Sequence, residues 1–170
     1  MNSKGTVIFV VISTFILSIA SQRSSLQIER DSAIYKLLSN YHHQDELEKL
    51  LHQWTEDYPN LAQVFSIGKS SQNRELLVMR LTSPMSNKVD LTDEFQLLKP
   101  KFKWVANMHG DETIGREMTI ALIYYLLINF KTDARIKQLL STTDIYIMPT
   151  MNPVKEKKKK LSICVWFLFD

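Results

Sequence analysis

The feature that most constrains the fold is a change of hydrophobic period around Gly110. Before it, Phe102, Trp104 and Ala106 alternate with Lys103, Val105 and Asn107, which predicts a partly buried strand. After it, apolar residues recur at helical spacing, namely Ile114, Met118, Ala121, Leu122, Tyr125 and Leu126. The segment therefore predicts a strand, a turn and a long helix. Open α/β sheets bind their ligands at such a turn, beyond the carboxyl end of a strand.

His109 and Glu112 lie three residues apart within this turn. An imidazole and a carboxylate are both zinc ligands, and a catalytic zinc ion takes three protein ligands and keeps one position open for water. The pair alone is a weak signal. The alternative is a surface turn in which His109 follows the strand and Glu112 sits in the first turn of the helix. Our hypothesis is that His109 and Glu112 are two ligands of one Zn²⁺ ion, with a third to come from elsewhere.

The remaining patterns predict one α/β domain with a mixed sheet. Helical spacing of Leu47, Leu50, Leu51 and Trp54 predicts an amphipathic helix that ends before Pro59. Strand-like runs at 62–67 and 75–82 flank a polar turn and predict a hairpin. A polar loop follows over 83–100, the long helix covers about 114–130, and a short helix and a strand are expected near 133–141 and 143–149.

The segment His109–Glu117 reads His-Gly-Asp-Glu-Thr-Ile-Gly-Arg-Glu and resembles the zinc-ligand segment of metallocarboxypeptidases, especially the carboxypeptidase D, N, E and M branch. Residues 41–47 resemble the opening helix of that branch. Residues 67–76 resemble its Gly-x-Ser-x-x-Gly-Arg-x-Leu hairpin, with Asn73 where glycine is usual. Residues 148–153 resemble the strand that leads into its Asn-Pro-Asp-Gly turn. The resemblance runs from about Tyr41 to Pro153.

The resemblance implies the N-terminal half of a metallocarboxypeptidase catalytic domain over residues 41–153. It implies one Zn²⁺ ion, peptide or protein C-termini as substrates, and removal of C-terminal residues, with Lys or Arg expected. In the family, a third ligand histidine, the groups that hold the substrate carboxylate and a general-base glutamate follow later in the chain. Residues 154–170 have no matching positions. We therefore expect a truncated, inactive form and assign no catalytic residue.

Arg116 has two interpretations. It could contact substrate or orient Glu112, or it could be an ordinary residue of the first helical turn that faces solvent or the sheet edge. Asp111 could accept a hydrogen bond from the imidazole but is not expected to bind the metal. The other histidines, His42, His43 and His52, are expected on or beside the first helix, away from the metal.

Both ends of the chain differ in composition from the middle. Residues 1–20 carry Lys4, an apolar run and a small-x-small sequence ending at Ala20, which predicts a secretory signal peptide and a secreted or luminal protein. The alternative is a signal anchor that stays in the membrane. Residues 21–40 are expected to be a linker or N-terminal segment. The single cysteine, Cys164, excludes an internal disulfide. Residues 154–170 are Lys-rich and then apolar, and we interpret them as an aberrant tail from intron read-through, an alternative last exon or a gene-prediction artefact.

That tail also supplies the formal net charge of +3, so the basic balance is no sign of nucleic-acid binding. Two other classes of function remain open. One is a non-catalytic secreted binding or decoy module. The other is a membrane-surface protein, since the lysines of residues 154–170 could contact anionic lipid.

Overall fold

A computed structural model describes residues 25–84, 99–153 and 166–168 of the 170-residue chain. The chain divides into two compact units, residues 1–39 and 40–170. In the first unit, residues 25–38 are helical, in a segment whose sequence predicts a linker or N-terminal segment. No Gly or Pro interrupts this stretch, and Gln27 donates a hydrogen bond one turn along to Asp31 (2.9 Å). The expected signal peptide, 1–20, lies outside the described residues.

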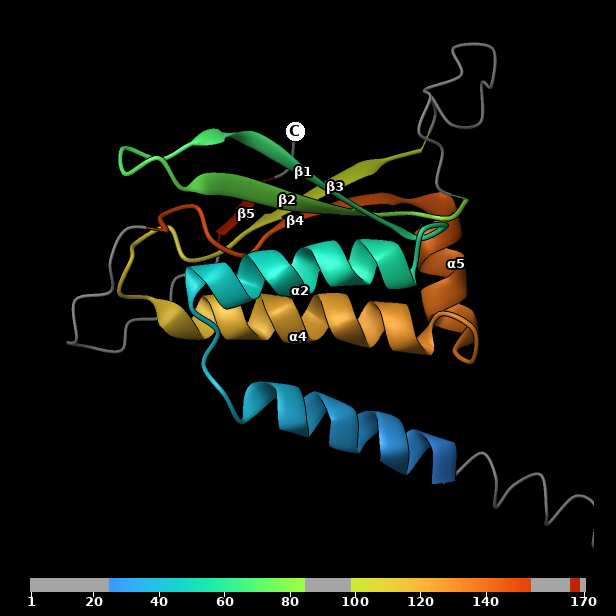
Figure 1. Ribbon diagram of the computed structural model, residues 1–170. Helices are drawn as coiled ribbons and strands as arrows, with labels where there is room; N and C mark the ends of the chain where they lie inside the picture. Colours follow the sequence, from blue (N-terminus) through green and yellow to red (C-terminus); the bar gives the residue numbers. More distant parts are fainter. Residues whose placement is uncertain (1–24, 85–98, 154–165, 169–170) are drawn as a thin grey trace, which may run out of the picture. The chain divides into compact units, whose positions relative to one another are not determined.

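The second unit begins with helix α2 (Gln44–Asp57), followed by strands β1 (Ala62–Lys69) and β2 (Glu75–Leu81) (Figure 1). Strand β3 (Lys101–Val105) leads into helix α4 (Thr113–Asn129), and helix α5 (Ala134–Thr142) leads into strand β4 (Asp144–Met148). Each of these elements was predicted from the sequence, with boundaries that differ by a few residues. From the Lys-rich tail only β5 (Trp166–Leu168) is described.

The five strands form one mixed sheet in the order β1-β2-β4-β3-β5. Strand β2 pairs antiparallel with both β1 and β4. Strands β3 and β4 are parallel, with Trp104 opposite Ile147, and β5 pairs antiparallel with β3. Because α4 and α5 connect the two parallel strands, the predicted mixed α/β fold is confirmed, and the turn after β3 lies at a carboxyl end of the sheet.

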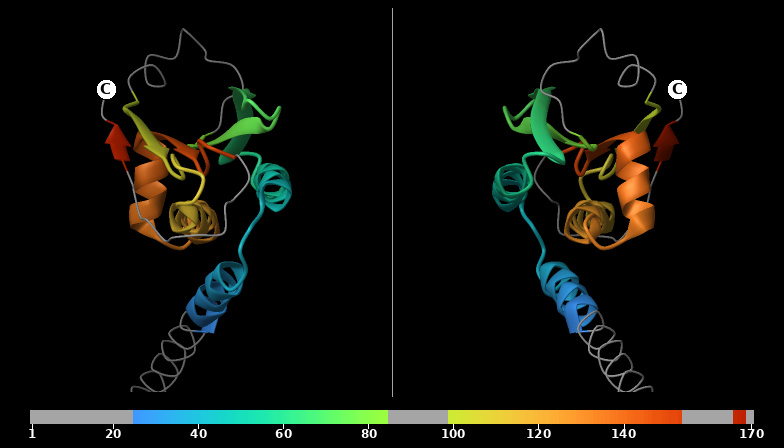
Figure 2. Two further views of the ribbon diagram at one scale, coloured as in Figure 1. Left: turned by 90° about the vertical axis from the view of Figure 1, so that its left-hand side faces the viewer. Right: turned by 90° about the vertical axis from the view of Figure 1, so that its right-hand side faces the viewer.

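Helices α2, α4 and α5 all lie on one face of the sheet (Figure 2). The core between them and the sheet contains the fully buried side chains Leu47, Leu51, Met79, Leu81, Ile120, Ile123, Leu127, Leu140 and Ile147. Trp54 of α2 stacks on Tyr124 of α4, with ring centroids 5.4 Å apart. This contact joins the two long helices, which run side by side in Figure 1. None of the helices in the described part of the chain is long and apolar enough to cross a lipid bilayer.

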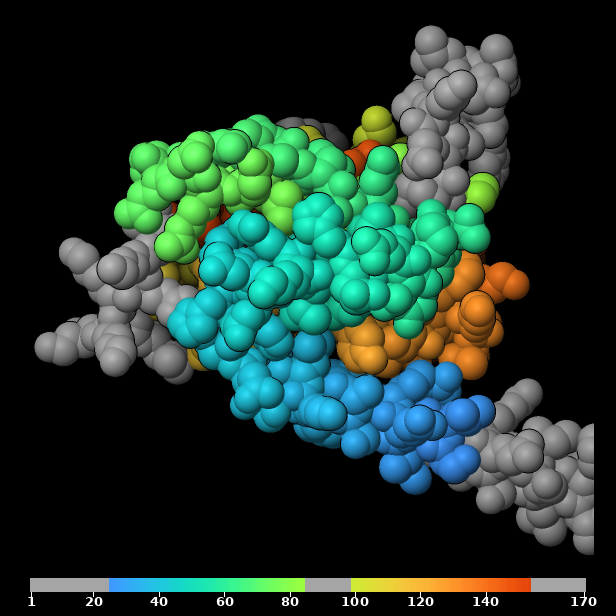
Figure 3. Space-filling view, viewed as in Figure 1, coloured from blue at the N-terminus to red at the C-terminus, as the bar shows by residue number. Residues whose placement is uncertain are grey.

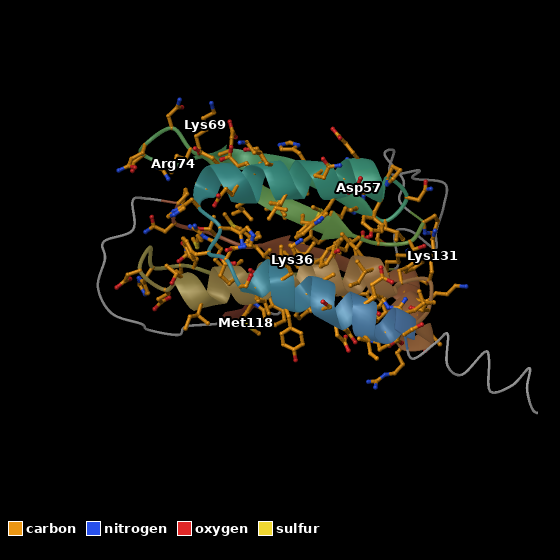
Figure 4. The ribbon with its side chains drawn as sticks, turned by 60° about the horizontal axis from the view of Figure 1, so that its bottom comes forward. Lys36, Asp57, Lys69, Arg74, Met118 and Lys131 are labelled. Atoms are coloured by element: carbon orange, nitrogen blue, oxygen red, sulfur yellow. The ribbon has the colours of Figure 1, made fainter. Side chains whose placement is uncertain are left out.

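The predicted hairpin joins β1 to β2, and Lys69 and Arg74 flank its turn at one end of the sheet (Figure 4). Asn73 has a φ of +62°, in the left-handed region that glycine and asparagine tolerate best. Arg74 donates a hydrogen bond to the carbonyl oxygen of Pro153 (2.9 Å). The hairpin thus ties the end of the family-like segment to the sheet, and in Figure 3 its side chains and those of α2 form one continuous surface.

Candidate metal centre

The loop between β3 and α4 is held at both ends by backbone hydrogen bonds. At its start, the Ala106 N–H donates to the Met148 carbonyl (2.9 Å), and the Ala106 carbonyl accepts from the Met151 N–H (3.0 Å). At its end, the Glu112 N–H donates to the carbonyl of His109 (3.0 Å), which closes a tight turn. Since β3 and β4 are parallel, the loop lies beside the segment that leaves β4, where Thr150 is placed.

The structure puts the two predicted ligands in this turn but in different environments. The His109 residue is exposed, whereas Glu112 is only 3% exposed. Glu112 is the residue before the first turn of α4, yet its side chain makes no capping hydrogen bond. Its Oε2 atom has no hydrogen-bond partner among the described residues. A buried carboxylate oxygen without a partner is costly, so the site is incomplete without a cation or another donor.

The donor types fit zinc, which binds imidazole nitrogen and carboxylate oxygen. Within the described ranges, however, no three His, Cys, Asp or Glu side chains gather closely enough to hold a metal ion. Asp111 is exposed and does not complete such a group. The described residues therefore offer at most two protein ligands, His109 and Glu112, and their role stays a prediction.

Arg116 is 2% exposed and does not face solvent. Its Nη1 atom donates to the hydroxyl of Tyr41 (2.9 Å) and to the His42 carbonyl (3.2 Å), and its Nη2 atom donates to Thr150 Oγ1 (3.1 Å). Arg116 thus joins the first turn of α4 to the segment before α2 and to the segment after β4. These contacts fit a supporting role better than the solvent-facing alternative.

The alternation over residues 102–107 did not identify Asn107 as a site residue, because it predicted Asn107 on the more exposed side of the strand. It is fully buried, at 0% exposure, and its φ of +49° lies in the left-handed region. The alternation ends at Val105 because the chain leaves the sheet there, so Asn107 turns inward. An asparagine between a strand and a turn was the one available signal, since asparagine tolerates a positive φ.

The remaining histidines lie on or just before α2, as expected. His43 and His52 are exposed. His42 is nearly buried, and its ring Nδ1 lies 2.7 Å from Glu117 Oε2. A carboxylate only accepts hydrogen bonds, so Nδ1 carries the proton in this pair. His42 is therefore held in a structural contact with α4.

Solved metallocarboxypeptidases share this mixed α/β fold over about two thirds of the chain. The sequence model of the family described as "Zinc carboxypeptidase" matches residues 47–153. This chain belongs to that zinc carboxypeptidase family.

Individual relatives agree. The chain is 39% identical over 114 residues to mouse carboxypeptidase D, covering 67% of this chain and 8% of the relative. It is 41% identical over 114 residues to mouse carboxypeptidase M, covering 66% of this chain and 24% of the relative. Among solved structures, carboxypeptidase A from Helicoverpa armigera is similar with a TM-score of 0.56 and 23% identity, covering 68% of this chain and 25% of that one. The chain thus spans a quarter or less of these relatives' lengths.

Proposed function

We propose that residues 41–153 form part of a zinc carboxypeptidase catalytic domain in which His109 and Glu112 bind Zn²⁺. The single observation that carries the proposal is Glu112, a buried carboxylate whose Oε2 has no partner among the described residues. It lies in the turn that leads from β3 into α4. The matched family and the relatives' names support zinc as the metal and peptide C-termini as the substrate class.

Each residue at this site would have a different role in metal binding. Glu112 supplies a negative charge in a dry environment, where its attraction for a cation is stronger than in water. His109 is exposed, so its imidazole is open to the solution from which metal and substrate arrive. Arg116, Asn107 and Thr150 hold the surrounding backbone. The zinc ion, when bound, polarises the scissile carbonyl and lowers the pKa of its bound water.

We further propose that this chain by itself turns over little or no substrate. A catalytic zinc ion takes three protein ligands, and two are supplied by the turn. A general base and a group that binds the substrate carboxylate are also needed, and each contributes orders of magnitude to rate. The family resemblance places such groups after the segment that this chain shares with its relatives. We also propose that the complete catalytic domain prefers peptides that end in Lys or Arg.

Zinc titration of the purified chain tests the site. Isothermal calorimetry at neutral pH should give one zinc ion with a Kd weaker than about 1 nM (about −12 kcal/mol). His109→Ala and Glu112→Gln should each weaken binding at least tenfold, whereas His52→Ala, which changes an exposed histidine of α2, should leave the Kd unchanged. Binding that is indifferent to both ligand substitutions would refute the site. A subnanomolar Kd would mean that a third ligand exists.

A peptidase assay tests the proposed inactivity and the expected preference for C-terminal Lys or Arg. Short peptides ending in Lys, Arg or Leu are incubated with the zinc-loaded chain, and release of the last residue is measured. We expect no turnover above that of the His109→Ala variant. Turnover that a chelator abolishes would contradict the proposed inactivity, and its rate on the Lys, Arg and Leu peptides would then test the preference. Tight peptide binding without turnover would instead favour the binding or decoy module.

The N-terminal segment bears on where the protein is located in the cell. We propose that the chain enters the secretory pathway, on the strength of the signal-like residues 1–20. N-terminal sequencing of the secreted product should find Ser21 first, and a product that begins at Met1 in the cytosol would contradict it. Binding to anionic liposomes that vanishes when Lys157, Lys158, Lys159 and Lys160 are neutralised would support the membrane-surface alternative.

A further inference from the structure

The buried side chain of Asn107 lies within hydrogen-bond distance of both predicted ligand residues. We assign its amide orientation from its neighbours, because only one orientation satisfies all of them. In that orientation Nδ2 donates to the carbonyl oxygens of His109 (2.8 Å) and Glu112 (3.2 Å). Its Oδ1 accepts from Arg116 Nη2 (3.0 Å) and from the Thr150 hydroxyl (2.6 Å). All four hydrogen-bonding positions of the amide are close to a partner.

This arrangement links the turn to rigid parts of the fold. On one side are the backbones of His109 and Glu112. On the other side are Arg116, anchored in α4, and Thr150, which follows β4. The Asn107 backbone is fixed as well, since its carbonyl accepts from the Asn152 N–H (3.1 Å). A side chain fixed in this way restricts the positions that the two ligand backbones can take.

We infer that Asn107 is a positioning residue that holds the His109 and Glu112 backbones in the spacing that metal binding needs. This inference rests on the proposed function of that pair. Its physical basis is preorganisation: a turn that is already ordered loses less conformational entropy when the ion binds. Partners that orient metal ligands typically contribute about 10- to 100-fold in metal affinity. Asn107 would act through the backbone and not as a ligand.

Three variants separate this role from simple packing. Asn107→Asp keeps two oxygens for Arg116 and Thr150 but loses both N–H donors to the turn, and its charge is next to a guanidinium. Asn107→Gly removes the whole side chain yet accepts the positive φ without steric strain. Thr82→Val is the matched control, because it removes an equally buried threonine hydroxyl that donates to the Leu140 and Thr143 carbonyls and makes no contact with the turn.

Hydrogen exchange of the metal-free full chain is the first measurement. Asn107→Asp and Asn107→Gly should speed exchange of the Glu112 amide about tenfold, the loss expected for about one hydrogen bond. Thr82→Val should leave that amide within about twofold of the wild type once global stability is corrected. Equal exchange in the Asn107 variants and the wild type would overturn the inference. This result does not depend on whether zinc binds.

Zinc affinity is the second measurement, by calorimetry as above. Asn107→Gly should raise the Kd about tenfold or more, whereas Thr82→Val should lower the melting temperature without raising the Kd. If His109→Ala and Glu112→Gln weaken binding but Asn107→Gly does not, the positioning role fails and the proposed function stands. If neither ligand substitution matters, the proposed function fails, and the exchange experiment still decides whether Asn107 holds the turn.

Discussion

The carboxylate of Glu117 accepts two hydrogen bonds from His42, one from its backbone N–H (2.9 Å) and one from its ring Nδ1 (2.7 Å). Glu117 lies in the second turn of α4, and His42 lies just before α2, 75 residues earlier in the chain. Their side chains are 15% and 11% exposed, so water screens the contact little. The pair, together with Arg116, fixes where α2 begins relative to α4, the helix that follows the candidate metal turn.

Glu117→Ala should destabilise the fold by about 1–3 kcal/mol, because it leaves the backbone N–H and ring N–H of His42 without their acceptor in a nearly buried place. Urea unfolding followed by circular dichroism would measure the loss. Glu56→Ala, at an exposed position of α2, is the control and should change stability by no more than about 0.5 kcal/mol. Equal effects of the two substitutions would show that the contact does not stabilise the fold.

Arg116→Lys should destabilise the chain by about 2–3 kcal/mol. A lysine ammonium group cannot donate to all three acceptors that the guanidinium contacts, so buried acceptors would lose their charged donor. Tyr41→Phe removes one of these partners and should cost less, about 1 kcal/mol. Thermal unfolding of the three proteins would rank them. An Arg116→Lys protein as stable as the wild type would mean that Arg116 does not support the fold, and its substrate-side interpretation would regain weight.

Asn73 allows the β1–β2 turn to adopt a positive φ. Asn73→Val should cost about 1–2 kcal/mol, because a β-branched residue is poorly tolerated in the left-handed region. Asn73→Gly should be nearly neutral. Gln72→Val, at the neighbouring exposed position, controls for the loss of a polar surface residue. Urea unfolding of the three variants would compare them. If Asn73→Val were no more destabilising than Gln72→Val, the conformational argument would be contradicted.

The hairpin also has a predictable response to acid. The Ser66 hydroxyl, followed by Lys69, lowers the pKa of Glu75 below its ordinary value of 4.5. Because the folded pKa is the lower one, the unfolded chain binds more protons in acid. The contribution of Glu75 to stability is therefore present above pH 4.5 and is lost as pH falls through the lowered pKa. An NMR titration of the Glu75 carboxyl should show a midpoint below 4.5, and Ser66→Ala should move it up. A midpoint that does not respond to this substitution would exclude the hydroxyl as the main cause.

Much of the fold followed from local pattern. The change of period around Gly110 predicted β3, the turn and α4. A strand with one buried face shows alternating apolar residues, and a helix with one buried face shows them every three or four residues. The hairpin followed from its polar turn. Residues 25–38 form a helix that their polar composition did not indicate, although nothing in the stretch breaks a helix.

What the sequence alone determined is the set of chemical groups in the turn: an imidazole and a carboxylate three residues apart, in a segment typical of zinc carboxypeptidases. What only the tertiary structure decided is their surroundings. It buried Glu112, turned Asn107 inward onto the His109 and Glu112 carbonyls, and brought Thr150 and Tyr41 to Arg116. The physical reason is distance along the chain. Periodicity reports the environment of neighbouring residues, whereas Thr150 and Tyr41 reach Arg116 from 34 and 75 residues away, through the pairing of β3 with β4 and the packing of α2 beside α4.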